Sequence, residues 1–339
     1  MSKDNGRRLG WVGAGRMGQA LAARLLAAGH DVAVYNRTRA KAESLAEAGA
    51  AIVDSPAELA DRDVVFTMVA GPEDFQQVVL GDDGLLSRDG VAPAVIVDLT
   101  TVSPEASAAV RAEAALRRAA LLAAPVSGNP NVVRAGRVTL VVSGPREAYD
   151  DVEPLLALLG AGVTYVGEGE RARLAKICHN LMLGVVAQCM AEIVVLAEKG
   201  GMSRHDFLEF LNSSVMGSMF TRYKTPAYVN LDFTPTFTPL LLRKDFDLGL
   251  QAARELDVPM PVAAELPDRL VHLGGGVDDD RRLELVVRLE RLARVGDVIE
   301  LLALDRAQRV VGGQDHLQGA ARHLVVLLRG EVGHGRFLS

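Results

Sequence analysis

The residue pair with the clearest chemical potential in this chain is Lys176 and Asn180, four positions apart. In a helix, residues four apart share one face. Their neighbours, such as Ile177 and Leu181, are largely apolar, and an ammonium in such surroundings loses hydration, which lowers its pKa. The pair therefore predicts an amine that gives or takes a proton near neutral pH. Six lysines occur against 31 arginines, so a filler lysine is unexpected, although a lysine stem lying along an apolar surface is the competing interpretation.

A second candidate for ligand binding is the pair Ser127-Gly128, which directly follows a β-rich run. Parallel sheets present ligand sites at the carboxyl ends of their strands. A serine hydroxyl and a glycine amide can both donate hydrogen bonds to a carboxylate. The pair favours an anion anchor, and a plain strand-to-turn transition is the alternative.

A glycine-rich hexapeptide near the start of the chain predicts a dinucleotide site. It follows an apolar strand candidate at residues 9–12 and opens an alanine-rich helix at 16–28, the context that makes G-x-G-x-x-G specific. Its glycines permit a tight turn, close approach of a pyrophosphate and close helix–strand packing, with the phosphates at the positive end of the helix dipole. A turn that binds nothing is the alternative. The motif consists of Gly13, Ala14, Gly15, Arg16, Met17 and Gly18.

The end of the next strand candidate predicts the form of the cofactor. Sites for NAD usually place an acid there to bind the ribose 2′-hydroxyl. Here Asn36 replaces the acid, Arg37 supplies a planar cation able to grip a 2′-phosphate, and Thr38 adds a hydroxyl. We expect NADP (NADPH) over NAD, with a solvated surface arginine as the alternative.

The elements that must position these groups alternate between strand and helix in the first half of the chain. This order predicts βαβ units, a mainly parallel sheet covered on both faces, and hence an α/β fold with an N-terminal Rossmann domain. From about residue 170 the pattern is helical, with helices expected at 170–199, from the N-cap Ser203 to 211, at 238–256 and at 262–273. The expected strands are residues 9–12, 31–36, 64–69, 94–99, 120–123, 138–143 and 163–166.

This change of pattern near Gly169 sets the expected domains. We expect a nucleotide-binding domain at 1–168, an all-helical C-terminal domain for substrate and dimerisation at 169–275, and an atypical tail at 276–339. Two helices are expected in the tail, at 281–303 and 316–328. The active site is expected between the first two domains.

Composition and charge exclude several classes of protein. A net charge of −6, with no dense cluster of basic residues, argues against a nucleic-acid partner. The most apolar segment, residues 177–197, contains polar residues and favours a buried helix over a membrane span. Cys178 and Cys189 lie too far apart on one helix for a disulfide, so we expect reduced core thiols in a cytoplasmic protein. The seven histidines form no ligand-spaced set, and no metal is expected.

Five ordered segments resemble the β-hydroxyacid dehydrogenase family, which includes 3-hydroxyisobutyrate dehydrogenases and glyoxylate/succinic semialdehyde reductases. They span roughly residues 9–260. Where many members continue the serine–glycine pair with a second glycine, this chain has Asn129-Pro130, which bears on the shape of the anion site and so on the substrate. The matching segments are the glycine motif at 13–18, residues 98–104, residues 124–128, Lys176 with Asn180, and residues 237–245.

The resemblance implies a role for each site residue. Lys176 would be the general acid/base, Asn180 would orient the substrate, and Ser127 with Gly128 would anchor its carboxylate. The remaining implied positions are near the cofactor or the cleft: Met68, Val69 and Thr101 at the nicotinamide ribose, Lys244 reaching to the cofactor, and Phe237 lining the cleft.

The expected activity is reversible hydride transfer between NADP(H) and a small hydroxy acid or aldehyde acid, by a homodimer or larger homo-oligomer. One rival is an imine reductase on the same scaffold, although such relatives usually carry Asp or Tyr at the position of Lys176. The other rival is a non-catalytic NADP-binding module, against which the presence of the lysine also counts.

Overall fold

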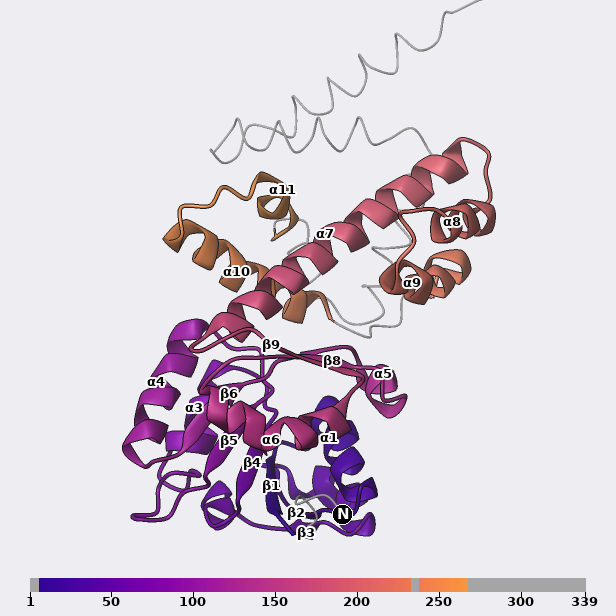
Figure 1. The fold of residues 1–339 in the computed structure, drawn as a ribbon. Helices are drawn as coiled ribbons and strands as arrows, with labels where there is room; N and C mark the ends of the chain where they lie inside the picture. Colours follow the sequence, from indigo (N-terminus) through magenta and orange to yellow (C-terminus); the bar gives the residue numbers. More distant parts are fainter. Residues whose placement is uncertain (1–5, 233–237, 268–339) are drawn as a thin grey trace, which may run out of the picture. The chain divides into compact units, whose positions relative to one another are not determined.

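The computed structural model describes residues 6–232 and 238–267, and its first part is built around a parallel sheet (Figure 1). Six strands pair in the order β3-β2-β1-β4-β5-β6, and every pairing is parallel. The order changes direction next to β1, which is the position where such sheets bind dinucleotides. The strands are β1 (Arg8–Val12), β2 (Asp31–Tyr35), β3 (Ala51–Ile52), β4 (Val64–Thr67), β5 (Val95–Asp98) and β6 (Ala120–Ala123).

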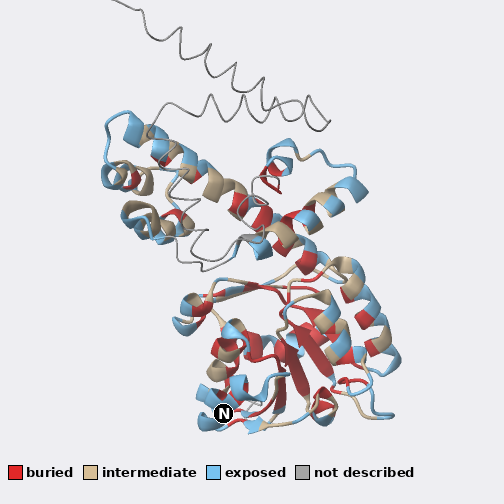
Figure 2. Ribbon diagram, turned by 180° about the vertical axis from the view of Figure 1, so that it is seen from behind, coloured by how far each residue is buried: buried red, intermediate tan, exposed pale blue. Residues whose placement is uncertain are grey.

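Side chains alternate between two apolar cores, one on each face of this sheet. Trp11 of β1 lies in one core and stacks on Phe66, with ring centroids 5.5 Å apart, whereas Val12 lies in the other. Figure 2 shows the central strands almost wholly buried, whereas the two residues of the edge strand β3 are exposed or half-buried. Helices α1 and α6 contribute to the first core, and α3 and α4 to the second. The helical segments are α1 (Arg16–Ala27), η1 (Arg39–Ala42), α2 (Glu43–Glu47), η2 (Pro56–Leu59), α3 (Pro72–Leu80), α4 (Pro104–Leu116) and α6 (Arg146–Leu159).

A second, three-stranded sheet follows β6. It consists of β7 (Val126–Ser127), β8 (Thr139–Val142) and β9 (Gly162–Tyr165), with α5 (Pro130–Arg134) between β7 and β8. Strand β8 pairs antiparallel with β7 and parallel with β9. The strands expected at 138–143 and 163–166 are present, but they belong to this small sheet rather than to the main one. Strands β3 and β7, of two residues each, were not predicted from the sequence.

From residue 171 the described chain is helical. It forms α7 (Arg171–Lys199), α8 (Arg204–Ser213), α9 (Met219–Asn230), α10 (Pro239–Glu255) and α11 (Pro261–Ala264). The predicted N-cap is confirmed, since the Ser203 side chain accepts a hydrogen bond from the Asp206 amide. The helix α9 was not expected. The end of the helix expected at 262–273 and the whole predicted tail lie outside the described residues, and the domain bounds stay a prediction.

Helices α7 and α10 approach closely through a glycine on each. A Cβ at Gly184 would collide with the ring of Phe246, and one at Gly249 would collide with the side chain of Leu181. Each helix thus has a notch filled by a side chain of the other. Phe246 and Leu181 also belong to the apolar cluster that joins the two helices. Only glycine at these two positions permits this separation of the helices.

Helix α7 is less buried than its apolar sequence suggests. By length and composition alone it could cross a membrane, with a mean hydropathy of 1.9 in its most apolar window, of which 28% is buried. Met182 and Leu196 are about 70% exposed. The expectation of a buried helix was therefore wrong for much of its surface, and so was the expectation of core thiols, since Cys178 and Cys189 are free and exposed. Helical spacing alone did not identify which face of α7 packs against α10.

Candidate active site

The glycine motif forms the turn between β1 and α1 and fits a dinucleotide phosphate. Gly13 adopts a φ of 101°, and a Cβ there would collide with the carbonyl of Met68. Gly18 lies against the Gly13 carbonyl, which also accepts a hydrogen bond from the Trp11 indole at 2.9 Å. Gly15, the N-cap of α1, has open space where a Cβ would stand, and no side chain caps the helix. The first-turn amides of α1 are thus left for an anion.

The residues after β2 organise the same turn. Asn36 accepts a hydrogen bond from the Ala14 amide at 2.8 Å and donates one to the Thr38 carbonyl at 2.7 Å. Arg37 has an 83% exposed side chain and pairs with Asp74 at 2.9 Å. Asn36 therefore stabilises the backbone around the glycine turn, while Arg37 presents a cation beside it. Arg16 is also exposed, and Met17 is half-buried.

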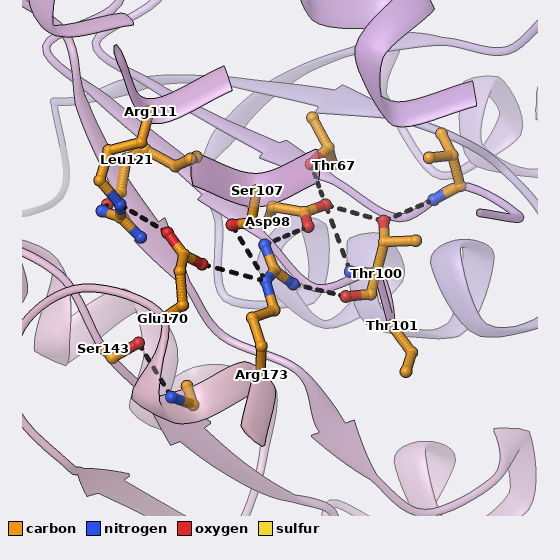
Figure 3. A network of polar contacts seen from close by, with 12 residues as sticks. Thr67, Asp98, Thr100, Thr101, Ser107, Arg111, Leu121, Ser143, Glu170 and Arg173 are labelled. Carbon is orange, nitrogen blue, oxygen red and sulfur yellow. Dashed lines mark hydrogen bonds and ion pairs between the residues drawn. The ribbon is translucent and has the colours of Figure 1, made fainter. Parts of the chain in front are cut away.

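The segments after β4 and β5 are joined by a buried polar network (Figure 3). The Thr67 and Thr100 hydroxyls donate to Asp98 Oδ1, at 2.6 and 2.7 Å. The Thr100 hydroxyl oxygen also accepts from the Val69 amide at 3.1 Å. The Met68 amide donates to Val12 of β1 at 2.8 Å. These bonds fix the backbone at two of the positions expected to contact the nicotinamide ribose.

Lys176 lies on the buried face of α7 with 9% of its surface exposed. Burial lowers its pKa to about 8, with Lys244 adding to the depression and Asp245 opposing it. Among the described residues no hydrogen bond or ion pair engages its ammonium. A buried, unengaged amine with a pKa near 8 has the properties that a general acid/base needs near neutral pH.

Asp245 and Lys244, on α10, complete the surroundings of this lysine. Asp245 is 2% exposed, and its Oδ2 accepts from the Asn180 amide nitrogen at 2.5 Å. Its other oxygen has no hydrogen-bond partner and lies 3.7 Å from Lys244 Nζ. Burial raises the pKa of Asp245, against the effect of both lysines. Lys244 Nζ also donates to the Thr101 carbonyl at 3.0 Å, so α10 contacts the loop after β5.

His179, which is not among the predicted site residues, links Ser127 to Asn180. His179 Nε2 lies 3.0 Å from Ser127 Oγ, and His179 Nδ1 lies 2.9 Å from Asn180 Oδ1. Because the Asn180 nitrogen donates to Asp245, its oxygen is the acceptor, so Nδ1 of His179 carries the proton. Neutral His179 then accepts from the Ser127 hydroxyl. Partial burial, with a smaller effect of Lys176, lowers the pKa of His179.

The residues after Ser127 shape the backbone of the expected anchor. Gly128 has a φ of 146°, and a Cβ there would press on Val138. The Asn129 side chain accepts hydrogen bonds from the amides of residues 131 and 132, at 3.0 and 3.1 Å, and donates to the Tyr223 hydroxyl at 2.8 Å. The departure at Asn129-Pro130 therefore caps α5 and links it to α9. Phe237 lies outside the described residues.

One cluster on α8 corrects the statement that no histidine has ligand spacing. His205, Asp206 and Glu209 lie close together and are all exposed. The histidine Nδ1 lies 3.4 Å from the Asp206 carboxylate and 3.9 Å from that of Glu209. Surface ion pairs account for this arrangement.

Known protein families match both the sheet-containing part and the helical part of the chain. Residues 8–167 match the family model of the NAD binding domain of 6-phosphogluconate dehydrogenase. Residues 170–287 match the model described as NAD-binding of NADP-dependent 3-hydroxyisobutyrate dehydrogenase. A 3-hydroxyisobutyrate dehydrogenase of Pseudomonas aeruginosa is 31% identical over 264 residues, which make up 76% of this chain and 88% of that protein. The chain belongs to the β-hydroxyacid dehydrogenase family.

Solved structures of similar proteins share the fold. Psf3 in complex with NADP⁺ and 2-OPP is 30% identical with a TM-score of 0.70, covering 78% of this chain and 93% of Psf3. The 3-hydroxyisobutyrate dehydrogenase of Mycobacterium tuberculosis, solved with L-serine, is 26% identical with the same TM-score and the same coverage. As a β-hydroxyacid dehydrogenase family member, the chain is a Rossmann-type oxidoreductase with a nicotinamide-binding domain.

Several residues of this family member's site escaped sequence reasoning. His179 is not among the predicted site residues, yet its ring contacts both Asn180 and Ser127. Trp11 is not among them either, and its indole nitrogen donates to the Gly13 carbonyl of the glycine turn. Asp245 ends the predicted segment 237–245 without an assigned role, and the sequence does not show that this carboxylate is almost completely buried. These contacts depend on side-chain length and tertiary position, which spacing along the chain does not give.

Proposed function

We propose that this family member catalyses reversible hydride transfer between NADP(H) and a small hydroxy acid or aldehyde acid, with Lys176 as general acid/base. The observation that carries the proposal is the burial of Lys176, with a pKa of about 8, beside Asn180 and Asp245. When bound, the nicotinamide supplies or accepts the hydride. In the reductive direction Lys176 Nζ gives a proton to the carbonyl oxygen of the substrate, and in the oxidative direction it takes the proton from the hydroxyl.

The anion anchor supports a substrate that bears a carboxylate. The Gly128 amide can donate to such a group. The Ser127 hydroxyl has a single proton, which it gives to His179 Nε2 in this structure, so it donates to the carboxylate by turning that proton from the histidine to the substrate. Asn180, fixed by Asp245, orients the substrate next to Lys176. The amide and hydroxyl groups of this anchor thus hold the acid end of the substrate, and Lys176 acts at its reacting carbon.

The preference for NADP rests on the residues after β2. In this proposal Arg37 binds the 2′-phosphate, Thr38 adds a hydroxyl, and Asn36 avoids the repulsion that an acid would cause. The glycine turn and the start of α1 hold the pyrophosphate, and Met68, Val69, Thr101 and Lys244 lie near the nicotinamide ribose.

The exposed apolar side chains of α7 support the proposal of a homodimer or larger homo-oligomer. Apolar groups such as Met182 and Leu196 gather on this helix, and exposed apolar patches mark interfaces more often than free surface. Sedimentation of the full chain tests this, with Leu196→Glu as the variant expected to shift the mass towards a monomer. A wild-type chain that is monomeric at all concentrations would contradict it.

The catalytic proposal is tested by NADPH oxidation against a panel of small aldehyde acids, with Lys176→Ala as the key variant. We expect turnover to fall by at least about a thousandfold while NADPH affinity stays within a few-fold, because the amine acts on the reacting oxygen rather than on the cofactor. Lys199→Ala, at the exposed end of the same helix, is the matched control and should keep full activity.

Three outcomes of these assays would contradict the catalytic proposal. Retained activity in Lys176→Ala would remove this residue from the mechanism. Activity on a cyclic imine above that on every aldehyde acid would favour an imine reductase. Tight NADPH binding with no turnover of any substrate would favour a binding module.

A further inference from the structure

A buried arginine one turn before Lys176 connects α7 to the loop that follows β5. The side chains of Arg173 and Asp98 have no exposed surface, and Arg173 Nη2 donates to Asp98 Oδ2 at 2.6 Å. Nη1 donates to the Thr100 carbonyl at 2.5 Å, and Nε donates to the Ser107 hydroxyl at 3.2 Å. One guanidinium therefore holds β5, the loop after it and α4 at once (Figure 3).

The same loop is held from a second helix. The Thr101 carbonyl, next to that of Thr100, accepts from Lys244 of α10. The Thr100 hydroxyl in turn holds the amide of Val69 after β4. Two cations on two helices thus bind consecutive carbonyls of one loop, and the Thr100 hydroxyl of that loop holds the backbone of Val69, one of the positions where we place the nicotinamide ribose.

Other contacts show that this arrangement suits arginine specifically. The Phe75 ring lies 5.9 Å from the centre of the Arg173 guanidinium, and Glu170 Oε2 lies 3.8 Å from its Nε. Lysine could pair with Asp98, but it lacks the planar fork that reaches Thr100 and Ser107 together. A buried ion pair often stabilises a protein no more than well-packed apolar side chains of similar size. Stability therefore does not account for the Arg173–Asp98 pair, and its fixed geometry is the feature that needs an explanation.

We propose that Arg173 is a positioning residue for the reaction, which fixes Lys176 on α7 relative to the nicotinamide-binding loop of residues 98–101. This inference rests on the proposed function. Residues three apart on a helix are neighbours on one face, so a displacement of Arg173 carries Lys176 with it. Because a reacting group displaced by about 1 Å can cost on the order of a hundredfold in rate, the effect is expected in turnover rather than in cofactor binding.

The test compares Arg173→Lys with wild type at equal numbers of NADPH-binding sites. We expect kcat to fall about tenfold or more, while the Kd for NADPH changes less than about threefold. The primary isotope effect with NADPH deuterated at the transferred position should rise, because a misplaced acid makes the chemical step more rate-limiting. A merely structural role would lower the folded fraction and leave the isotope effect and kcat per binding site unchanged.

Arg111→Lys is the matched control. Arg111 is partly buried, donates to Glu170 at 2.8 Å and to the Gly169 carbonyl at 3.1 Å, and within the described part of the chain makes no hydrogen bond or ion pair with residues 98–101. We expect it to lower thermal stability with little change in the isotope effect. If Arg173→Lys does not fold, the double variant Asp98→Asn with Arg173→Met removes both charges together and should show the same loss of kcat.

A readout without turnover separates this inference from the proposed function. Acylation of Lys176, followed by peptide mapping, should be slowed by NADPH in wild type and much less in Arg173→Lys. If wild type reduces none of the aldehyde acids, the proposed function fails, and the protection experiment still decides the role of Arg173. Equal protection, equal kcat per site, or loss of NADPH binding in Arg173→Lys would each overturn the inference.

Discussion

In the proposed mechanism, the pKa of Lys176 leads to opposite pH profiles for the two directions of the reaction. With a pKa of about 8, the amine is nearly all protonated at pH 7, and roughly a tenth remains protonated one pH unit above its pKa. Reduction needs the protonated amine, so its kcat should be flat below about pH 7 and fall to about a tenth by pH 9. Oxidation needs the neutral amine, so its kcat should rise about tenfold over the same range and then level off.

The assay is the initial rate of NADPH oxidation or NADP⁺ reduction with both substrates saturating, from about pH 6 to pH 10. A lysine with an ordinary pKa near 10.4 would still be about 95% protonated at pH 9, so the reductive rate would hardly change there. His179 does not confuse the result, because burial lowers its pKa from the ordinary value of 6.5, which already lies below the pH interval in which Lys176 is expected to titrate.

Two variants on α10 test the origin of the shift. The Asp245 carboxylate favours protonated Lys176, so Asp245→Asn should move the midpoint to lower pH. The Lys244 ammonium disfavours it, so Lys244→Met should move the midpoint to higher pH. A reductive rate that stays flat to about pH 10, or midpoints that move in the same direction in both variants, would refute the assignment of this pKa to Lys176.

Further predictions concern the cofactor and the anion anchor. Gly15→Ala should keep the melting temperature within a degree or two, because its Cβ meets no protein atom, yet it should weaken NADPH binding at least about tenfold by occupying the space through which the phosphate approaches. Gly18→Ala should instead lower the melting temperature in the same thermal scans, since its Cβ collides with the backbone of the turn. His179→Asn and Ser127→Ala should each raise KM for the carboxylate substrate more than they change kcat. The double variant should raise the free energy of substrate binding by less than the sum of the two single effects, whereas additive effects would show that the two residues act separately. Arg37→Ala should reduce the kcat/KM preference for NADPH over NADH by about tenfold or more, and an unchanged ratio would contradict its role.

Sequence patterns identified the features of this fold that are local. The glycine motif was recognisable because its strand and helix flank it directly, and the structure adds the physical reason for each glycine. Lys176 was recognisable from apolar neighbours on one helix. In both cases the chemistry depends on residues within a few positions of one another.

The features that escaped prediction depend on contacts between distant segments. Asp98 and Arg173 are 75 positions apart, and nothing in either neighbourhood predicts that they bury each other completely. The strands β8 and β9 were predicted individually, but a strand pattern does not show which sheet it joins. A helix position likewise gives the direction in which His179 leaves the backbone, but not how far its ring can turn towards Ser127.

The paired notches at Gly184 and Gly249 bear on how this enzyme can change its substrate. They hold α7, which carries Lys176, at a fixed spacing from α10, which carries Asp245 and Lys244. Gly184 is about two turns from Lys176, and Gly249 is about one turn from Asp245. An added methyl group at either glycine would wedge the helices apart and let water in beside the amine, returning its pKa towards that of a lysine in solution. In the proposed mechanism, substitutions around Ser127 could therefore enlarge the substrate site, whereas substitutions that separate α7 from α10 would lower the catalytic rate.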